Sequence, residues 1–322
     1  MNTLITGGLG YIGSHIAIRL KKKAVIIDNL SNSCLDYKKI LPHAKVYIKD
    51  INFKSLKEIF TNHKIKNVIH LAGFKSVEES ISSPLKYYEN NINSTLTLLN
   101  CMNQFNVNNL VFSSSATVYG HNNLNPLKEN SKLSSTSPYG STKLLIEKMI
   151  TEFVQSKKEF KAITLRYFNP IGANVKKKLS EKPLGMPQNL MPMIIKSILE
   201  KKSLSIYGNN YNTKDGTCIR DYIHVEDLAL AHILALKKMK LINSHKILNI
   251  GLGKGVSVYE LIKIFEKSNK VKVDYKFCPR RPGDIPISYA DNKKARAFLN
   301  WKPIYNYKQM CIDSWESAIK KN

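Results

Sequence analysis

The sequence has few acidic side chains, few arginines and no long hydrophobic run. Among 322 residues, 24 Asp and Glu stand against 50 Lys and Arg, which gives a formal net charge of +26. No apolar stretch approaches the roughly 20 residues that a membrane span requires, so we expect no membrane protein. Residues 1–13 already have the pattern of a strand and a glycine loop, which leaves no room for a signal peptide. We therefore expect a cytoplasmic protein.

Cysteine is scarce, and the spacing of the cysteines excludes the usual metal and redox motifs. The five cysteines are an odd number, and no two stand at such a spacing. The eight histidines contain no His-x-x-x-His pair on a predicted helix, so we predict no metal. Ordinary reduced thiols are expected at Cys34, Cys101, Cys218, Cys278 and Cys311.

The positive charge raises the question of a nucleic-acid partner. Lysine supplies nearly all of it, because only six basic residues are arginines, and Asn and Ile are abundant as well. That combination is typical of an A+T-rich genome. The lysines form short clusters such as 21–23 and 176–178 rather than a basic arm. We therefore expect no nucleic-acid partner, and at most a surface that attracts anionic substrates.

The first half of the chain alternates between strand and helix patterns. This alternation predicts an α/β fold with a doubly wound parallel sheet of the Rossmann type. The expected strands are 4–6, 24–28, 45–49, 67–72, 110–114 and 162–167, and the expected helices are 11–23, 53–63, 84–105 and 137–157.

After about Asn169 the pattern becomes irregular, because Pro, Gly and Asn recur frequently. Helices are expected at 227–238 and 257–267, and a strand near 247–250. We predict a nucleotide-binding domain over 1–169 and a smaller substrate lobe over 170–322. Segments near 220–250 are expected to return to the first domain.

A glycine loop connects the first predicted strand to the first predicted helix. Gly7, Gly10 and Gly13 form a Gly-x-x-Gly-x-x-Gly pattern, with Tyr11 and Ile12 at the helix start. Glycines allow the backbone to approach a pyrophosphate, and the helix N-terminus offers free N–H groups to the anion. Such a triplet also occurs in tight turns, so it is weak by itself.

Asp28 ends the second predicted strand, about 20 residues after the glycine loop. A carboxylate at this place accepts hydrogen bonds from the adenosine ribose and repels a 2′-phosphate. The alternative is a strand-end Asp that starts a turn with Asn29. Together with the loop and the sheet pattern, Asp28 predicts NAD as the cofactor in preference to NADP.

Tyr139 and Lys143 stand four residues apart at the start of a predicted helix, and therefore on one helix face. A nearby ammonium group favours the phenolate, so Lys143 is expected to lower the Tyr139 pKa and make the phenol a general base. Lys143 is also expected to hold the nicotinamide ribose. Ser115 ends the fifth predicted strand and is expected to hydrogen-bond the same substrate hydroxyl. The alternative is an ordinary surface Tyr and Lys.

Several longer motifs resemble those of the UDP-glucose 4-epimerase family of extended short-chain dehydrogenases/reductases. The resemblance extends over nearly the whole chain, and the last two motifs are specific to sugar-nucleotide enzymes. The segments are 6–15, 113–120 (SSSATVYG), 137–143 (SPYGSTK), 165–172 (LRYFNPIG), 215–227 (DGTCIRDYIHVED) and 279–284 (PRRPGD).

The resemblance implies an isomerase that keeps NAD bound. Tyr139 would remove the proton of the sugar 4-hydroxyl while a hydride leaves C4, and the hydride would return to the other face of a 4-keto intermediate. The cofactor residues implied by the motifs and the resemblance are Gly7, Gly10, Tyr11, Ile12, Gly13, Asp28, Asn29, Ser33, Asp50, Ile51, Leu71, Ala72, Gly73, Lys75, Asn90, Ser113, Tyr139, Lys143 and Phe168.

The resemblance also implies a UDP-hexose site. A guanidinium fork suits a diphosphate better than an ammonium does, which makes the few arginines informative. Arg220 would otherwise form an ion pair with Asp221 or Asp227. The implied substrate residues are Lys75, Ser115, Tyr139, Asn169, Asn189, Leu190, Tyr207, Arg220, Arg281, Asp284 and Ser288.

Ser288 stands where some of these epimerases carry a bulky Tyr beside the sugar 2-position. A small Ser leaves room for an N-acetyl group. We therefore predict activity on UDP-N-acetylglucosamine and its galacto epimer in addition to UDP-glucose and UDP-galactose.

Two other functions remain open from the residues. A sugar-nucleotide 4,6-dehydratase would need carboxylates where Ala116 and Thr117 stand, and neither residue does acid–base chemistry. A non-catalytic NAD-binding protein is expected to have lost Tyr139 or Lys143, and both are present. The long helices 84–105 and 139–157 are expected to pair across a two-fold axis, as in the family's homodimer.

Overall fold

A computed structural model describes residues 2–33, 36–121, 124–281 and 283–320. Cys34, one of the five expected thiols, and Pro282, within one of the motifs, lie outside these ranges. Within the described ranges, every helix is too short or too polar to cross a bilayer.

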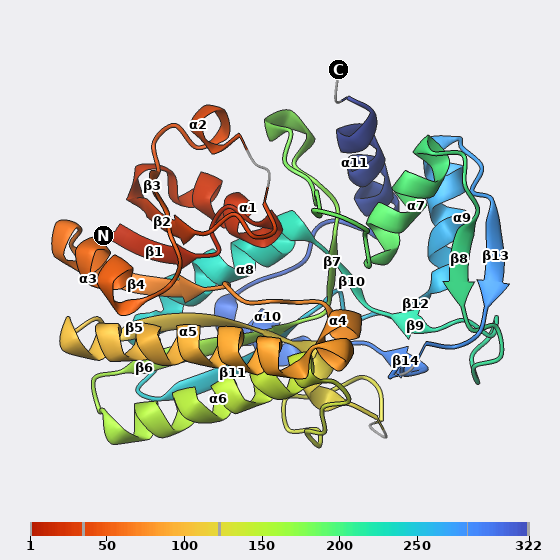
Figure 1. Ribbon diagram of the computed structural model, residues 1–322. Helices are drawn as coiled ribbons and strands as arrows, with labels where there is room; N and C mark the ends of the chain where they lie inside the picture. The colour runs from red at the N-terminus through yellow and green to blue at the C-terminus, as the bar shows by residue number, and fades with distance from the viewer. Residues whose placement is uncertain (1, 34–35, 122–123, 282, 321–322) are drawn as a thin grey trace.

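A seven-stranded, fully parallel sheet forms the centre of the molecule (Figure 1). Its strand order, β11-β6-β5-β4-β1-β2-β3, runs outward in both directions from β4 and β1. The prediction of a doubly wound parallel sheet is thus confirmed. The strands are β1 Asn2–Thr6, β2 Ala24–Asp28, β3 Lys45–Ile48, β4 Ile65–His70, β5 Asn109–Ser115, β6 Lys161–Tyr167 and β11 His245–Ile250.

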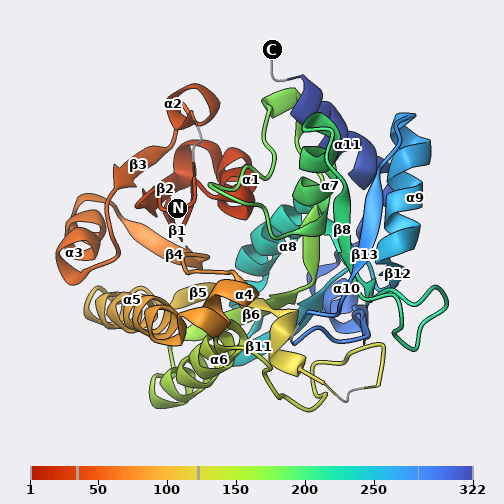
Figure 2. The same ribbon diagram turned by 45° about the vertical axis from the view of Figure 1, so that its right-hand side comes forward.

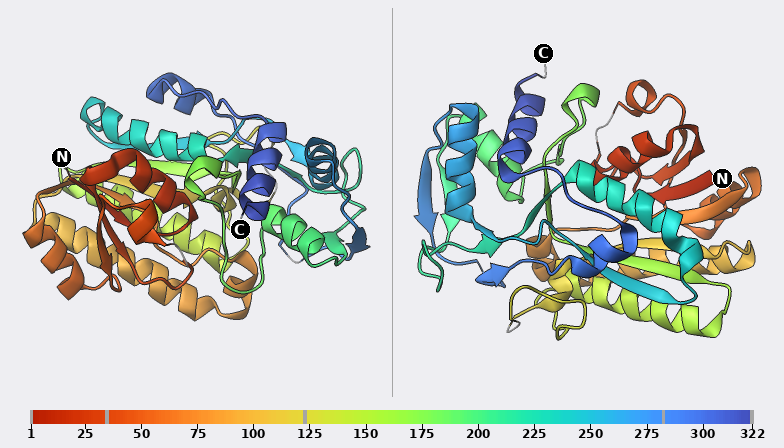
Figure 3. Two further views of the ribbon diagram at one scale, coloured as in Figure 1. Left: turned by 90° about the horizontal axis from the view of Figure 1, so that it is seen from above. Right: turned by 180° about the vertical axis from the view of Figure 1, so that it is seen from behind.

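Helices cover both faces of this sheet, as the view from above in Figure 3 shows. One face carries α1, α8 and α10, and the other carries α3, α5 and α6. Their bounds are α1 Tyr11–Leu20, α3 Phe53–Asn62, α5 Pro84–Gln104, α6 Pro138–Ser156, α8 Val225–Lys238 and α10 Lys293–Leu299. The short helices α2 Tyr37–Ile40 and α4 Val77–Ser82 lie in connections.

The sequence of the central strands explains the two layers. Successive side chains of a strand point to opposite faces, so a strand buried on both faces is apolar throughout. In β1, Leu4 packs into the α3–α5–α6 layer and Ile5 into the α1–α8 layer. In β2, Ile27 packs into the α3–α5–α6 layer and Ile26 into the α1–α8 layer. Each such side chain contributes about 1.5–3 kcal/mol by burial.

The remaining elements form three small sheets and three helices at one side of the main sheet (Figure 2). We call these elements the C-terminal region. Its strand pairs are β7 with β10, β8 with β13, and β9 with both β12 and β14. The bounds are β7 Asn169–Ile171, β8 Leu204–Tyr207, β9 Ile219–Arg220, β10 Tyr222–His224, β12 Val256–Ser257, β13 Tyr275–Cys278, β14 Ile287–Ser288, α7 Leu190–Leu199, α9 Val258–Asn269 and α11 Tyr307–Ile319.

The sequence predictions succeed in the main sheet and miss much of the C-terminal region. Strand β2 has the expected bounds, whereas β4 runs over Ile65–His70, shifted toward the N-terminus by two residues. Helices α7 and α11 and the small strands were not predicted. Strands of two to four residues carry too little periodicity to be seen, and their partners are distant in sequence.

Candidate functional site

A cleft of about 1360 Å³ lies at the carboxyl ends of the parallel strands, where the C-terminal region faces the sheet. Open parallel sheets bind ligands at this edge. Every predicted site residue except Ser113 lines the cleft. They include Ile12, Ile51, Leu71, Ala72, Gly73, Asn90, Phe168 and Leu190.

The glycine loop is packed so closely that side chains cannot be accommodated at two of its glycines. Gly7 has φ +67°, and a Cβ there would stand 2.9 Å from the Ala72 nitrogen. A Cβ on Gly13 would stand 2.4 Å from the Gly7 oxygen. Gly10 is less crowded inside the chain, since a Cβ on it would stand 3.3 Å from the Gly7 oxygen. Its lack of a side chain therefore serves mainly the approach of a ligand.

Helix α1 begins immediately after Gly10, and no side chain caps its first turn. The N–H groups at the start of a helix lack intrahelical partners and carry the positive end of the helix dipole. Here they open into the cleft beside Tyr11, whose hydroxyl donates to the Gly172 oxygen at 2.7 Å. This geometry fits a pyrophosphate.

Asp28 links the end of β2 to the glycine loop. Its Oδ2 accepts the Leu9 N–H at 2.9 Å and its Oδ1 accepts the Leu30 N–H at 2.9 Å. Each oxygen keeps further acceptor capacity, since a carboxylate has about four acceptor positions, and Asp28 lines the cleft. The residue thus fits a role as an acceptor of ribose hydroxyls, and it also starts the turn that the alternative prediction described.

The neighbours of Asp28 continue this wall of the cleft. Asn29 donates from Nδ2 to Asp50 Oδ1 at 2.8 Å, and Ser33 donates to the Leu9 oxygen at 2.7 Å. These contacts hold the two loops that follow β2 and β3 against the glycine loop. The residues present therefore fit a bound dinucleotide such as NAD.

Tyr139 and Lys143 lie on one face of α6 at the centre of the cleft, as the spacing predicts. Ser137 caps this helix by accepting the Gly140 N–H, and Pro138 occupies its first turn. The Lys143 ammonium donates to the Ser113 oxygen at 2.9 Å and lies 5.9 Å from the centre of the Tyr139 ring. Ser113 thus acts from behind the cleft wall, through its carbonyl group.

The expected lowering of the Tyr139 pKa is not the net result. Burial is the larger effect and raises the pKa of Tyr139 to about 12, while a hydrogen bond with the Ser115 side chain lowers it. Burial also lowers the pKa of Lys143 to about 8, and Glu147 opposes that shift. The physical reason is that desolvation disfavours both charged forms, and the ammonium is held by a carbonyl rather than by the phenol.

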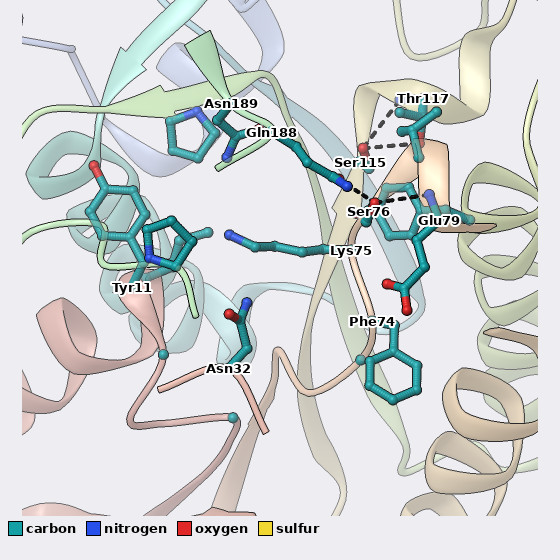
Figure 4. A pocket seen from close by; sticks show the side chains of 18 of the residues that line it. Tyr11, Asn32, Phe74, Lys75, Ser76, Glu79, Ser115, Thr117, Gln188 and Asn189 are labelled. Carbon is teal, nitrogen blue, oxygen red and sulfur yellow. Dashed lines mark hydrogen bonds between the residues drawn. The ribbon is translucent and has the colours of Figure 1, made fainter. Parts of the chain in front are cut away.

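Ser115 ends β5 and points into the cleft beside Thr117 (Figure 4). Its Oγ receives hydrogen bonds from the Thr117 N–H at 3.2 Å and from the Thr117 hydroxyl at 3.0 Å. Because a serine hydroxyl has two lone pairs and one proton, these bonds leave its proton for Tyr139 or a substrate.

A buried ion pair between α6 and β6 supports this helix on the face of the sheet that it covers. Arg166 and Glu147 are almost fully buried, with 2.6 Å between Nη2 and Oε2, and Ser114 donates to Glu147 Oε1 at 2.5 Å. Glu147 follows Lys143 by one helical turn. The sequence did not predict this ion pair, because nothing in the pattern of a helix and a distant strand shows that their side chains meet.

Arg220 and Arg281 meet at the far end of the cleft, on either side of Asp284. Arg220 Nη2 lies 3.6 Å from Asp284 Oδ1, and Arg281 Nε donates to Asp284 Oδ2 at 3.2 Å. The Arg281 guanidinium lies over the Tyr207 ring, 4.8 Å from its centre. Ser288 pairs with Arg220 across β14 and β9. The cluster combines two guanidinium groups with an aromatic face, which suits a nucleoside diphosphate.

The alternative role for Arg220, an ion pair with Asp221 or Asp227, is wrong. The carboxyl group of Asp221 accepts backbone N–H groups of Leu252, Gly253 and Ala290. That of Asp227 accepts the N–H groups of residues 304 and 305. Both carboxyls are thus engaged by the main chain, and Arg220 faces Asp284 instead.

Lys75 extends across the cleft toward the side of Tyr11 in Figure 4. Its ammonium donates to Glu181 Oε1 at 2.9 Å, and Asn189 donates to the same oxygen at 2.7 Å. Gln188 likewise contacts Ser76. Glu181 and Gln188 were missed, because they lie in the stretch of Pro and Gly where the sequence carries no periodicity.

Comparisons with known proteins agree with this geometry. Residues 3–251 match the model of the NAD dependent epimerase/dehydratase family. The chain is 42% identical to the UDP-glucose 4-epimerase of Bacillus subtilis, covering 98% of this chain and 96% of that protein.

Solved structures give the same result. One neighbour is a UDP-glucose 4-epimerase from Stenotrophomonas maltophila with bound NAD and formylated UDP-arabinopyranose, at TM-score 0.95 and 39% identity, covering 99% of this chain and 98% of that one. Another is the UDP-Glc/GlcNAc 4-epimerase from Campylobacter jejuni, at TM-score 0.84 and 34% identity, covering 99% of each chain. The resemblance seen in the motifs and the prediction of NAD as the cofactor are thereby confirmed. The chain belongs to the NAD dependent epimerase/dehydratase family and, within it, to the UDP-glucose 4-epimerases.

Proposed function

We propose that this protein interconverts UDP-glucose and UDP-galactose by inverting C4 of the bound hexose. One observation carries the proposal: a single cleft contains a dinucleotide loop, a Tyr-Lys pair and an arginine cluster in that order. The relatives named above are epimerases of this kind. A dehydratase is not favoured, because Ala116 and Thr117 supply no carboxylate beside the reacting carbon.

The chemistry divides between the cofactor and the chain. Bound NAD supplies an acceptor and donor of the hydride at C4. Tyr139 takes the proton of the 4-hydroxyl as that hydride leaves, which gives a 4-keto sugar, and returns the proton when the hydride comes back to the opposite face. Ser115 donates a hydrogen bond to the same oxygen, and Lys143 stabilises the phenolate through its positive charge.

The far end of the cleft holds the nucleotide in this proposal. Arg220 and Arg281 neutralise the diphosphate, Asp284 accepts from the uridine ribose, and Tyr207 packs against the uracil. Asn169 and Asn189 donate to the phosphates or the sugar. Anchoring through the invariant UDP portion leaves the hexose free to present either face, as inversion requires.

We also propose that the enzyme accepts the N-acetylated UDP-hexoses. Ser288 lines the cleft with only a hydroxymethyl group, and the Campylobacter jejuni relative is described as a UDP-Glc/GlcNAc 4-epimerase. Ser288→Tyr is expected to abolish turnover of UDP-N-acetylgalactosamine and to retain that of UDP-galactose, and Ser288→Ala is expected to retain both.

The deciding experiment is a panel of UDP-sugars with product detection, together with NAD measured after denaturation. We expect stoichiometric NAD and turnover of all four UDP-hexoses. Turnover of UDP-galactose without turnover of UDP-N-acetylgalactosamine would disprove the dual specificity. Absence of any turnover with NAD present would favour the non-catalytic binding protein.

We propose a homodimer formed through α5 and α6. These helices pack side by side, and their outer faces expose Leu85, Leu96 and Leu145 at 79%, 45% and 44%. The resemblance to the epimerase family implies such a dimer, and in it these leucines would be buried against the same helices of a second copy. Sedimentation analysis of wild type and of Leu96→Glu tests this proposal.

We further propose that the enzyme acts in the cytoplasm. Cys101, Cys218, Cys278 and Cys311 are free thiols, which suits a reducing compartment. The division into an NAD-binding domain over 1–169 and a substrate lobe over 170–322, with a return near 220–250, is proposed as well. It is supported by β11 and α8, which pack in the main sheet and its helix layer.

A further inference from the structure

Asp221 lies directly after Arg220, in the short link between β9 and β10, where β9, β12 and β14 meet (Figure 1). Its side chain is completely buried and does not line the cleft. An acidic side chain that is fully buried is costly unless its oxygens are hydrogen-bonded. Its contacts therefore show what it does.

The main chain of Asp221 joins the strands that present three predicted substrate residues. Its N–H donates to the Ser288 oxygen at 3.0 Å, and its carbonyl accepts the Asn169 N–H at 3.0 Å. Arg220 precedes it in the chain. Asp221 thus connects Arg220, Ser288 and Asn169. These are the residues proposed above for the diphosphate, for the sugar pocket, and for the phosphates or the sugar.

The side chain of Asp221 ties this junction to two further segments. Oδ1 accepts the Leu252 N–H at 2.7 Å, and Oδ2 accepts those of Gly253 at 2.9 Å and Ala290 at 3.1 Å. A Cβ on Gly251 would stand 2.4 Å from Oδ2, so the loop after β11 is fitted closely around the carboxyl group.

These contacts are not those of a charge pair. Among the described residues, no basic side chain forms an ion pair with Asp221, and its bonded partners are backbone N–H groups of two separate segments. Only a carboxyl group offers acceptors on both oxygens. An asparagine would turn its NH₂ group toward at least one of the three donors.

We propose that Asp221 is a positioning residue for the UDP-sugar: it fixes Arg220, Ser288 and Asn169 in one arrangement from behind the cleft. This inference rests on the function proposed above, because it concerns the binding of the same substrate. The hydrogen bonds of Asp221 described above go to segments other than the glycine loop, so we expect its replacement to leave NAD binding unchanged.

The test is Asp221→Asn in the full-length enzyme. We expect KM for UDP-galactose to rise about tenfold while kcat changes less than threefold and NAD content remains stoichiometric. Asp227→Asn is the matched control: this aspartate is also buried and accepts two backbone N–H groups, but from residues 304 and 305, away from the cleft. It is expected to lower Tm and leave KM unchanged. Equal KM values in wild type and Asp221→Asn would overturn the inference.

Hydrogen exchange of the wild type provides a measurement that needs no variant. Saturation with UDP is expected to slow exchange at the amides of Leu252, Gly253 and Ala290, none of which lines the cleft. Unchanged exchange at these amides, with UDP shown to bind, would contradict the inference. A wild type that neither binds UDP nor turns over UDP-galactose would instead contradict the proposed function.

Discussion

The two ends of the cleft are constructed in different ways. The NAD end consists of main chain: Gly7 and Gly13 bring backbone atoms together at distances that exclude a Cβ, and the start of α1 offers its N–H groups. The UDP end consists of the long side chains of Arg220 and Arg281, which are 15% and 39% exposed. Both contact the carboxylate of Asp284.

This difference implies different responses to mutation. A site made of closely packed backbone cannot move to accommodate a new side chain, because the added atoms collide with the main chain of the fold. A site made of side chains tolerates exchange at a graded cost in affinity. We therefore expect retention of NAD to be lost abruptly and affinity for the UDP-sugar to change gradually. The reacting pair lies between the two ends and governs the chemical step.

The largest expected effect is that of Tyr139→Phe, at the junction of the two ends. Loss of the proton acceptor is expected to lower kcat by about 10²- to 10⁴-fold. Steady-state kinetics with UDP-galactose measure it, and NAD content and affinity for UDP are expected to stay unchanged. Tyr37→Phe, outside the cleft, serves as the control with full activity. A Tyr139→Phe enzyme with wild-type kcat would remove Tyr139 from the mechanism.

The second comparison tests the backbone end with two neighbouring glycines. Gly13→Ala is expected to destabilise the fold by about 1–3 kcal/mol, because its Cβ meets the Gly7 oxygen at 2.4 Å. Gly10→Ala is expected to keep nearly the wild-type Tm and still lose NAD, because its Cβ obstructs only the ligand. Thermal unfolding and NAD content of the purified variants separate the two results. Full NAD retention in Gly10→Ala would show that this end is less rigid than we argue.

A smaller effect is expected at the side-chain end. Arg281→Lys keeps the charge and removes the guanidinium fork and its stacking on Tyr207, so KM is expected to rise about tenfold, or about 1.4 kcal/mol. The same exchange at Arg280 is the control, since Arg280 stacks on Tyr211 and does not line the cleft. Equal KM values for the two variants would erase the distinction between these arginines.

The smallest effect is that of pH on the free energy of unfolding. Its sign differs between the main sheet with its helices and the C-terminal region. In the main sheet and its helices, burial lowers the pKa of His70 to about 3 and those of His15, His232 and His245 to about 4. An unfolded histidine titrates near 6.5, so each contributes stability that is present above that pH and lost below it. At pH 6 the loss is on the order of 1 kcal/mol for each histidine.

Asp221 acts in the opposite direction. Burial raises its pKa to about 7, above the unfolded value of 3.8, so its contribution grows as the pH falls. At pH 6 this contribution is expected to offset about 1 kcal/mol of the stability that the histidines lose. Urea unfolding is therefore expected to give a smaller free energy of unfolding at pH 6 than at pH 7.5, because the four histidines outweigh the one aspartate. A more stable protein at pH 6 would contradict the histidine assignment.

The sequence by itself determined the parallel sheet, the glycine loop and the Tyr139–Lys143 pair. Each depends on a pattern that is local in the chain: alternation of strand and helix, a glycine triplet after a strand, and a four-residue spacing on one helix. The charged motifs around Arg220 and Arg281 were also visible, because arginine is rare in this chain.

Tertiary structure alone decided which of these residues face one another. Arg220 and Asp284 are separated by 64 positions, and Lys75 and Glu181 by 106, so no periodicity joins them. Burial, too, is a property of the folded chain: it raises the Tyr139 pKa where the spacing suggested a lower one. Asp221 looked like the partner of its neighbour Arg220, yet folding surrounds its carboxyl group with backbone N–H groups from two distant segments, since buried N–H groups need acceptors and the buried carboxyl group supplies them.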